Sequence, residues 1–286
     1  MTRIITIPVH LDTHRESIDV FLSGDIHYPD PGTVLDSWHR WRDAVVENVE
    51  LGRKTYNGLM GDYCSVYVDG DKRRPPDNRL PDPLEVYSKM RDWIRPLAPT
   101  NVCTLTGNHD EDWWKKENID FVSWMCAELG LNYGNYESLV TFEIYRENNK
   151  TDNPDKYVDM VLWHGDGGGR TRGGAMNASA RPVESHPYAD IVAVGHTHRL
   201  GILNEQNVIP QRRCRKPDGA VLDFDDKNQF IVMTGGYQKG YLSDMSTYIS
   251  KKMLPPVTIG GVKLRVTPFK DVGGSDMVTV VLEQIY

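Results

Sequence analysis

Histidine, aspartate and asparagine residues gather in five short blocks along the first two thirds of the chain. Each block directly follows an apolar run of the length of a β-strand. The blocks are Gly24-Asp25-Ile26-His27, Gly61-Asp62, Gly107-Asn108-His109-Asp110, His164-Gly165-Asp166 and Gly195-His196-Thr197-His198. A lone histidine after a strand is more often a core or surface residue than a ligand, but five of the nine histidines lie in these blocks. Because open α/β sheets bind ligands outside the carboxyl ends of their strands, we expect one common site.

The spacing within two blocks suits a pair of metal ions. Asp25 and His27 are two residues apart, so both can contact one ion at a bend of the chain. His196 and His198 have the same spacing, so one of them could face each of two ions.

The oxygen ligands complete this set. The Asp62 carboxylate has two oxygens and can bridge two ions, and Asn108 offers a neutral amide oxygen. Imidazole and oxygen ligands without a thiolate suit Mn²⁺, Fe or Zn²⁺ better than Ca²⁺. Two such ions, ~3.5–4 Å apart, would hold a phosphoryl group and generate a hydroxide nucleophile.

Other segments carry weaker signals. The glycines before Arg170 do not form a Walker loop, because no Lys-Ser/Thr follows. Arg170 could clamp a phosphate, and a solvated turn is an equal alternative. The basic segment 72–79 is either a rim for nucleic acid or, more simply, a solvated loop within the segment 69–83. Trp113 and Trp114 could stack on a base, although packing beneath a loop is the simpler interpretation.

The apolar runs predict an α/β sheet. Five of them are continuous rather than alternating, which is typical of strands buried on both faces: Ile18–Ser23, Tyr56–Met60, Val102–Thr106, Val158–Trp163 and Ile191–Val194. Helical patterns alternate with several of these strands, at 34–49, 83–94 and 119–129. In the first helix, Trp38 and Trp41 have the spacing of core residues, and Thr33 with Asp36 resembles a capping box.

The pattern of apolar residues along the chain changes after Gly201. Short β-type runs follow one another there with few helical patterns, which favours a second sheet packed on the first. They are 207–210, 220–223, 229–234, 262–266 and 277–285. No segment has the length and composition of a domain linker, so we expect residues 1–286 to form a single domain.

Composition excludes several classes of protein. The formal charge of −7 argues against a strongly basic protein that coats nucleic acid and against a polybasic protein that binds membranes. It does not exclude nucleic acid as a substrate. No run approaches a membrane span or the apolar core of a signal peptide, so we expect no membrane partner and a cytoplasmic location. The four cysteines form no C-x-x-C pair, which excludes a zinc knuckle and predicts reduced thiols.

The ordered series D-x-H, GD, GNH-D, H and GH-x-H resembles the calcineurin-like metallophosphoesterase superfamily over residues 18–201. The fourth block, HGDGGGRTRGG, followed about thirty residues later by GHTH, is similar to phage-encoded members, which would place the protein in the host cytoplasm. The resemblance implies a four-layer αββα sandwich of two mixed β-sheets flanked by helices.

The resemblance also implies roles for the residues of the blocks. Asp25, His27 and His198 would hold the first metal, and Asn108, His164 and His196 the second. Asp62 would bridge the two ions, for which Mn²⁺ is the first choice. His109 would act as the general acid at the leaving-group oxygen.

One block departs from the family pattern. Many members have a second acid three residues after the aspartate of the GD block, where this chain has Ser65. The position usually lies behind the ligands, so the departure affects the hydrogen bonding around His109 more than the binding of metal.

The sequence therefore predicts a hydrolase, a two-metal phosphoesterase, with phosphodiesters in nucleic acid (a nuclease) as the favoured substrate. A phosphomonoesterase acting on a nucleotide or phosphoprotein is the alternative. A non-catalytic interaction module on the same fold is a weaker rival, because all seven ligand positions and His109 are filled.

Overall fold

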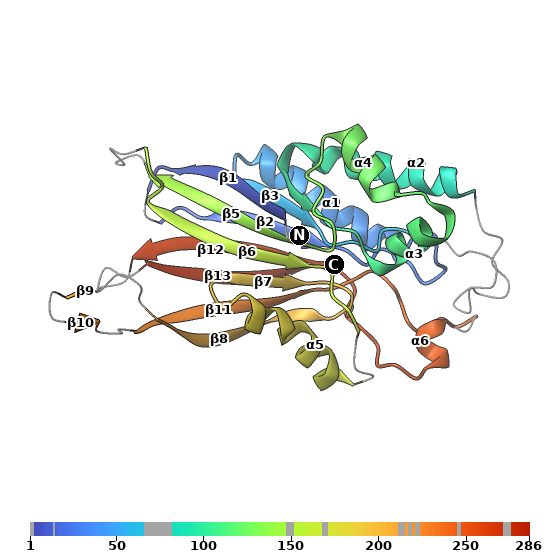
Figure 1. Cartoon of the computed structure of the whole chain (residues 1–286). Helices are drawn as coiled ribbons and strands as arrows, with labels where there is room; N and C mark the ends of the chain where they lie inside the picture. Colours follow the sequence, from blue (N-terminus) through green and yellow to red (C-terminus); the bar gives the residue numbers. More distant parts are fainter. Residues whose placement is uncertain are drawn as a thin grey trace.

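The computed structural model shows two mixed β-sheets packed face to face, with helices on both outer sides (Figure 1). This is the expected four-layer αββα sandwich. The structure describes residues 3–13, 15–65, 82–146, 152–167, 171–210, 215–216, 219–220, 224–244, 247–270 and 276–286.

The first sheet has five strands and draws them from both ends of the chain. Its order is β13 (Asp276–Ile285), β12 (Gly261–Lys270), β2 (Ile18–Ser23), β3 (Thr55–Leu59) and β4 (Asn101–Thr104). The strands β2, β3 and β4 are parallel, whereas β12 and β13 run antiparallel to their neighbours.

The second sheet has six strands. Its order is β1 (Arg3–Leu11), β5 (Glu137–Arg146), β6 (Lys156–Trp163), β7 (Ile191–Val194), β11 (Phe224–Thr234) and β8 (Leu200–Pro210). The pairs β6–β7 and β7–β11 are parallel. A separate two-stranded ribbon consists of β9 (Arg215–Lys216) and β10 (Gly219–Ala220).

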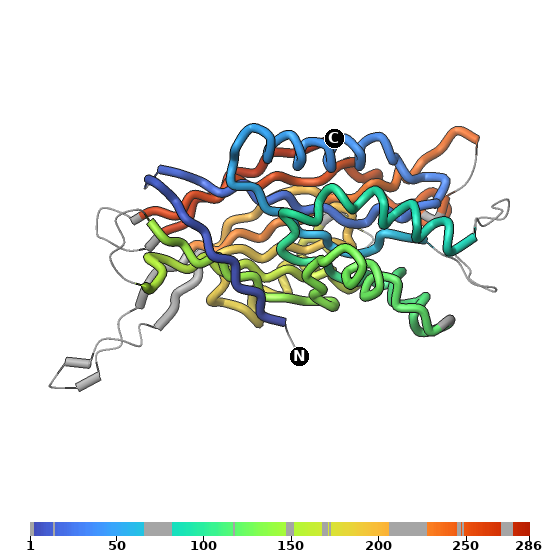
Figure 2. Tube along the Cα trace, turned by 90° about the horizontal axis from the view of Figure 1, so that it is seen from above, coloured from blue at the N-terminus to red at the C-terminus, as the bar shows by residue number. Residues whose placement is uncertain are grey.

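Helices cover the two outer faces unequally. The five-stranded sheet carries α1 (Leu35–Glu50), α2 (Pro83–Ile94), α3 (Asn108–Glu117) and α4 (Phe121–Leu129), with the 3₁₀ turn η1 (Arg95–Thr100) (Figures 1 and 2). The six-stranded sheet carries α5 (Arg172–Ser185), and the short α6 (Tyr248–Lys251) lies apart from both.

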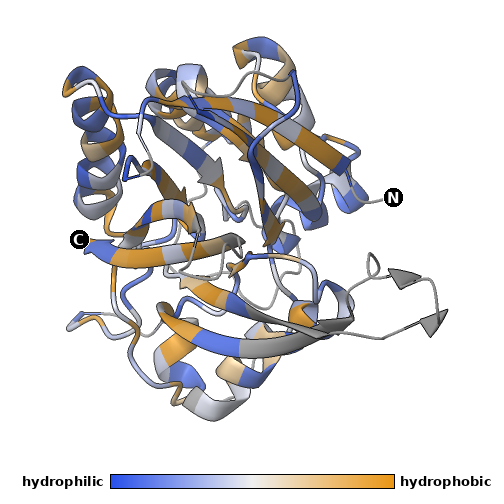
Figure 3. Ribbon diagram, turned by 90° about the vertical axis from the view of Figure 1, so that its left-hand side faces the viewer, coloured by the Kyte–Doolittle hydropathy of each residue, from blue (hydrophilic) through white to orange (hydrophobic). Residues whose placement is uncertain are grey.

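Three apolar layers hold this arrangement together. The central layer lies between the sheets and includes Val20 of β2 and Met160 of β6. Phe21, the next residue of β2, points into a second layer under the helices of the five-stranded sheet, and Val161 points into a third layer under α5. Because these strands are buried on both faces, their sequences are continuously apolar, as expected; Figure 3 shows strands with long orange stretches.

Two predictions about the elements were wrong. The β-type runs after Gly201 do not build a second large sheet by themselves: β8 and β11 extend the sheet of β6 and β7, β12 and β13 extend the sheet of β2, and only the short ribbon of β9 and β10 is separate. The capping box is also absent, because the Thr33 hydroxyl donates to the carbonyls of Ile26 and His27, and α1 begins after Val34.

The expected burial of the two tryptophans is confirmed. Trp38 and Trp41 are fully buried. The thiols of Cys64, Cys103 and Cys126 are free and buried, and Cys214 lies outside the described residues. No helix among the described residues is long and apolar enough to cross a membrane.

Candidate metal centre

The five sequence blocks converge, although they come from two sheets rather than one. Asp25 follows β2, Asp62 follows β3, and Asn108 begins α3 just after β4, all in the five-stranded sheet. His164 follows β6 and His196 follows β7, both in the six-stranded sheet. The site therefore lies where the carboxyl ends of parallel strands from both sheets meet.

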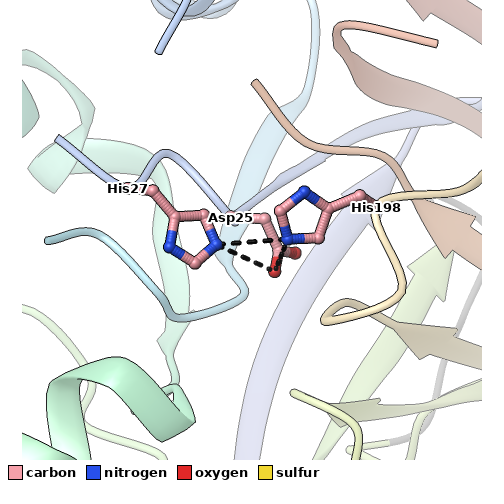
Figure 4. Close-up of side chains that lie close together, drawn as sticks. All are labelled: Asp25, His27 and His198. Carbon is pink, nitrogen blue, oxygen red and sulfur yellow. Dashed lines mark hydrogen bonds and ion pairs between the residues drawn. The ribbon is translucent and has the colours of Figure 1, made fainter. Parts of the chain in front are cut away.

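A first group of ligands consists of Asp25, His27 and His198 (Figure 4). The Nε2 atoms of the two histidines are 3.1 Å apart. Asp25 Oδ1 lies 3.3 Å from His198 Nε2 and 3.9 Å from His27 Nε2. The other oxygen of Asp25 accepts from the backbone N–H of His196 at 2.9 Å, which ties the two sheets together.

Asp62 lies between this group and a second one formed with His164 and His196. Asp62 Oδ2 is 3.7 Å from His27 Nε2 on one side and 3.4 Å from His164 Nε2 on the other. Asp62 Oδ1 accepts from the backbone N–H of His109 at 2.8 Å. The Asp62 carboxylate therefore lies between the His27 ring and the His164 ring.

Asn108 contributes its side-chain amide to the second group. The amide is 2.7 Å from His196 Nδ1 and 3.2 Å from His164 Nε2. With its nitrogen turned inward it donates to both rings and to Asp62 Oδ2. A cation at this point requires the oxygen inward instead.

Hydrogen bonds behind the ligands orient two of the rings. His27 Nδ1 is 3.0 Å from the hydroxyl of the buried Ser65, and His164 Nδ1 is 2.6 Å from the carbonyl of Met60. Such partners fix the tautomer of a metal-binding histidine, so that Nε2 can present its lone pair. Ser65 occupies the place of the second acid that the family pattern leads one to expect, and its contact with His27 was not foreseen from the sequence.

Asp110 supports the loops rather than joining the ligands. Its Oδ2 accepts from the backbone N–H groups of Asp62 and Gly107, at 2.8 and 2.9 Å. Asp110 thus acts as a turn and capping residue. A side chain at Gly107 would overlap the Asp62 carboxylate, so this close approach requires glycine.

The backbone of the site is unusual. Five candidate ligands have φ between +51° and +59°, in the left-handed region that non-glycine residues rarely adopt: Asp25, His27, Asp62, His196 and His198. Each such residue costs of order 1–3 kcal/mol, and residues of this kind concentrate at functional sites.

Burial controls the protonation of the histidine ligands. It lowers the pKa of His27 and His196, and lowers the pKa of His198 to about 3. These rings are therefore neutral and their lone pairs are free to bind a cation. Burial opposes protonation of His164 too, but the Asp62 carboxylate outweighs it and raises the pKa of His164 to about 9.

The two carboxylates differ from each other. Burial raises the pKa of Asp25 well above its ordinary value, and the Asp62 charge adds to this effect. Burial acts the same way on Asp62, but His164 and His109 outweigh it and hold its pKa well below the ordinary value.

The donor set fits divalent cations. Asp25 Oδ1 is fully buried and has no hydrogen-bond partner in the described part of the chain, although a buried carboxylate normally has one. Neutral imidazole nitrogens and carboxylate oxygens face one another within 4.8 Å, an arrangement that a cation between them would stabilise. At His164, such a cation would replace the proton.

His109 is partly exposed, and with His27 and Asp62 it forms a third group of possible metal ligands, whose ligand atoms lie within 4.8 Å of one another. Its ring meets the His27 ring edge-on, with centroids 4.5 Å apart. The side chain therefore faces the first group of ligands from the helix α3 side, while its backbone anchors Asp62.

A cavity of about 380 Å³ adjoins the second group. The Tyr136 ring forms the wall toward His164, with ring centroids 6.0 Å apart. The half-exposed Trp114 indole also borders the cavity, whereas Trp113 is buried against Tyr87. The lining residues are Thr106, Glu111, Trp114, Asp120, Tyr133, Asn135, Tyr136 and Glu137.

Some residues singled out in the sequence cannot be placed relative to the two ligand groups. Arg170, the basic segment 72–79 and most of the segment 69–83 fall outside the described residues. His186 pairs with Glu137 at 3.1 Å and is not part of either ligand group.

One comparison with known proteins identifies a family. A model of the calcineurin-like phosphoesterase family matches residues 18–200, more than half of the chain. No curated protein sequence matches.

Two solved structures are similar at low identity. Vps29 from Chaetomium thermophilum is 12% identical, with a TM-score of 0.34 over 94% of this chain and 96% of that one. A conserved uncharacterized protein from Streptococcus pneumoniae TIGR4, titled a predicted phosphoesterase, is 11% identical, with a TM-score of 0.32 over 93% of this chain and 98% of that one.

Proposed function

The chain belongs to the calcineurin-like phosphoesterase family, and from this premise we propose that it is a phosphoesterase with a dinuclear metal centre. The observation that carries the proposal is the position of Asp62. Its carboxylate lies within 3.7 Å of a ring nitrogen of each ligand group, as a bridge between two ions requires.

We assign the ligands by group. Asp25, His27 and His198 hold one ion, Asn108, His164 and His196 hold the other, and Asp62 contacts both. When bound, the two ions would polarise the phosphoryl oxygens and activate water for attack. The donor set suits Mn²⁺ first, with Fe or Zn²⁺ as alternatives.

We propose His109 as the general acid. It is partly exposed, stands beside the ligand groups, and lies outside the ligand set that we assign. We propose that its imidazolium donates a proton to the departing oxygen of the ester. The contact between its backbone N–H and Asp62 Oδ1 holds α3, and with it this ring, against the metal centre.

For the substrate, we propose a phosphodiester in nucleic acid. The support is the likeness of the fourth block to phage-encoded members. Arg170, a candidate phosphate clamp, and the basic segment 72–79, a candidate rim for nucleic acid, belong to the same proposal.

One observation favours the second candidate, a monoesterase that acts on a nucleotide or another small ester. Among the described residues that line the cavity beside the second ligand group, Glu111, Asp120 and Glu137 are acidic, and none is a lysine or an arginine. Carboxylates repel a polyanion that lies across them, whereas they tolerate a small ester with a single phosphoryl group at the metals.

A comparison of substrates in Mn²⁺ tests both candidates. A model diester, a model monoester, single-stranded DNA and double-stranded DNA are assayed side by side, with the Asp62→Asn variant as the control for contaminating activity. Hydrolysis of the diester and of DNA is the expected result. Hydrolysis of the monoester alone would favour the second candidate, and no hydrolysis of any ester by metal-loaded protein would favour a non-catalytic role.

A further inference from the structure

The segment that follows β11 packs directly against the first ligand group. Gly236 is buried, and its backbone lies beside Asp25 and His198. A Cβ atom built on Gly236 would be 3.0 Å from Asp25 Cβ and 3.2 Å from both Cγ and Nδ1 of His198. Contacts this short force the neighbouring side chains to move.

Backbone hydrogen bonds hold this segment in place. Tyr237 N–H donates to the Asp25 carbonyl at 3.0 Å, and Val34 N–H donates to the Tyr237 carbonyl at 2.8 Å. Lys239 N–H donates to the Gly32 carbonyl at 2.7 Å. The segment is thus bonded along the loop that carries Asp25, so an added side chain cannot be relieved by a simple shift of the backbone.

His198 differs from two other histidine ligands in how it is oriented. His27 has Ser65 at Nδ1, and His164 has the Met60 carbonyl. His198 Nδ1 is buried and has no hydrogen-bond partner among the residues that the structure describes. Packing must therefore define the position of this ring, and Gly236 lies against that same nitrogen.

We propose that Gly236 is a positioning residue of the metal centre. Its lack of a side chain lets the segment after β11 pack closely on Asp25 and His198, and this contact sets the His198 ring beside Asp25 Oδ1. The role rests on the proposed metal centre. It predicts that even one methyl group at this position disturbs the ion of the first ligand group and leaves the second group intact.

The variant Gly236→Ala tests this role against Gly173→Ala. A Cβ on Gly173, in α5, meets no atom within 4 Å, so the control makes the same chemical change in open space. Mn²⁺ stoichiometry and affinity are measured by titration calorimetry, and electron paramagnetic resonance separates a coupled pair of ions from a single ion. We expect two ions in the wild type and in Gly173→Ala. In Gly236→Ala, one of the two ions binds at least about tenfold more weakly, and the spectrum becomes that of isolated Mn²⁺.

The outcomes separate this role from the proposed function. A wild-type chain that binds no Mn²⁺ overturns the proposed function and this role with it. Two ions of unchanged affinity in Gly236→Ala overturn this role alone, as does equal weakening of both ions.

A double variant keeps the test decisive if Gly236→Ala does not fold. His198→Ala removes the ring that the added methyl group meets. The pair Gly236→Ala/His198→Ala should then lose less stability relative to His198→Ala than Gly236→Ala loses relative to the wild type, because the contact with the ring is gone and only the contact with Asp25 Cβ remains. A double variant that fails to fold, or that loses as much stability as the separate changes together, contradicts the role.

Discussion

At the scale of single residues, Asp62 lies between the two proposed ligand groups, and our assignment makes it a ligand of both ions. Its Oδ2 faces His27 and His164, while its Oδ1 holds the N-terminus of α3 through His109 N–H. The neighbouring rings keep the pKa of Asp62 far below its ordinary value, so the carboxylate carries its charge throughout the pH range of an assay.

Replacing Asp62 with asparagine should weaken both ions together. The amide keeps the size of the side chain but removes the bridging charge. Phosphoesterase activity should fall by orders of magnitude and should not return when Mn²⁺ is added in excess, which a metal titration of activity measures. Full recovery at millimolar Mn²⁺ would show that Asp62 serves one ion or none.

Replacing His109 with alanine separates acid catalysis from metal binding. The variant should retain its metals and lose roughly 10²–10⁴ in rate on an ester with a poor leaving group, such as a DNA oxygen. The loss should be smaller for a nitrophenyl ester, because nitrophenolate leaves without protonation. Metal analysis and the two rate constants are the measurements.

Two results would contradict the assignment of His109. Loss of metal together with activity would show that His109 only supports the loop of Asn108. An equal loss of rate on both leaving groups would show that no proton is donated to the departing oxygen.

At the scale of secondary-structure elements, β2, β12 and α1 meet at the buried carboxylate of Asp19. Asp19 lies at the end of β2 that is farther from the proposed metal centre. Asp19 accepts hydrogen bonds from Arg265 Nε and Asn48 Nδ2, both at 3.1 Å. Two further cations face the same carboxylate: Lys263 Nζ lies 3.5 Å and Arg53 Nη1 lies 3.8 Å from Asp19 Oδ2. Burial alone would raise the pKa of Asp19, but the bonds from Arg265 and Asn48 outweigh it and lower the pKa.

The Asp19→Asn variant should therefore be less stable at neutral pH. A hydrogen bond to a charged group contributes about 1.5–3 kcal/mol, so the free energy of unfolding should fall by about that amount. Because the folded pKa is depressed, this stability is present above the unfolded pKa, near 3.9, and is lost as the pH falls through the folded value. Urea titrations of both proteins at pH 7 and pH 3 measure the difference.

A matched control comes from the surface of α1. Asp43→Asn removes an exposed carboxylate that pairs with Arg42, and such pairs contribute little. Its stability should match that of the wild type at both pH values. A stability difference for Asp19→Asn that is unchanged at pH 3 would show that the charge of Asp19 is not the cause.

At the scale of the whole molecule, the proposed metal centre draws its ligands from both sheets. Asp25, His27, Asp62 and Asn108 come from the five-stranded sheet, and the histidines at 164, 196 and 198 come from the six-stranded one. Ions bound between them must be released when the sheets separate, so binding should stabilise the complete fold.

Mn²⁺ should accordingly raise the melting temperature of the protein. A ligand at 100 times its dissociation constant adds about 2.7 kcal/mol per site to the folded state. A chelator should reverse the increase, and Asp62→Asn should show little of it. Calorimetric melting curves with and without Mn²⁺ are the measurement, and a wild-type melting temperature that does not depend on Mn²⁺ would contradict a centre that spans both sheets.

The sequence by itself determined the local features of this protein. Continuous apolar runs such as Ile18–Ser23 indicate strands buried on both faces, and the period of Trp38 and Trp41 indicates the buried side of a helix. The candidate ligands were predictable for the same reason: their residue types and their place directly after strands are local properties.

Only the tertiary structure decided how these pieces combine. The five strands divide between two sheets, and β12 lies beside β2 across most of the chain, because the order of strands depends on long-range packing rather than on local periodicity. The partners of the ligands are equally remote: Ser65 is 38 residues from His27, and Met60 is 104 residues from His164. Nothing in the sequence around Gly236 distinguishes it from an ordinary turn glycine. Its contact with Asp25 and His198 exists only because β11, in one sheet, and β2, in the other, end close to each other.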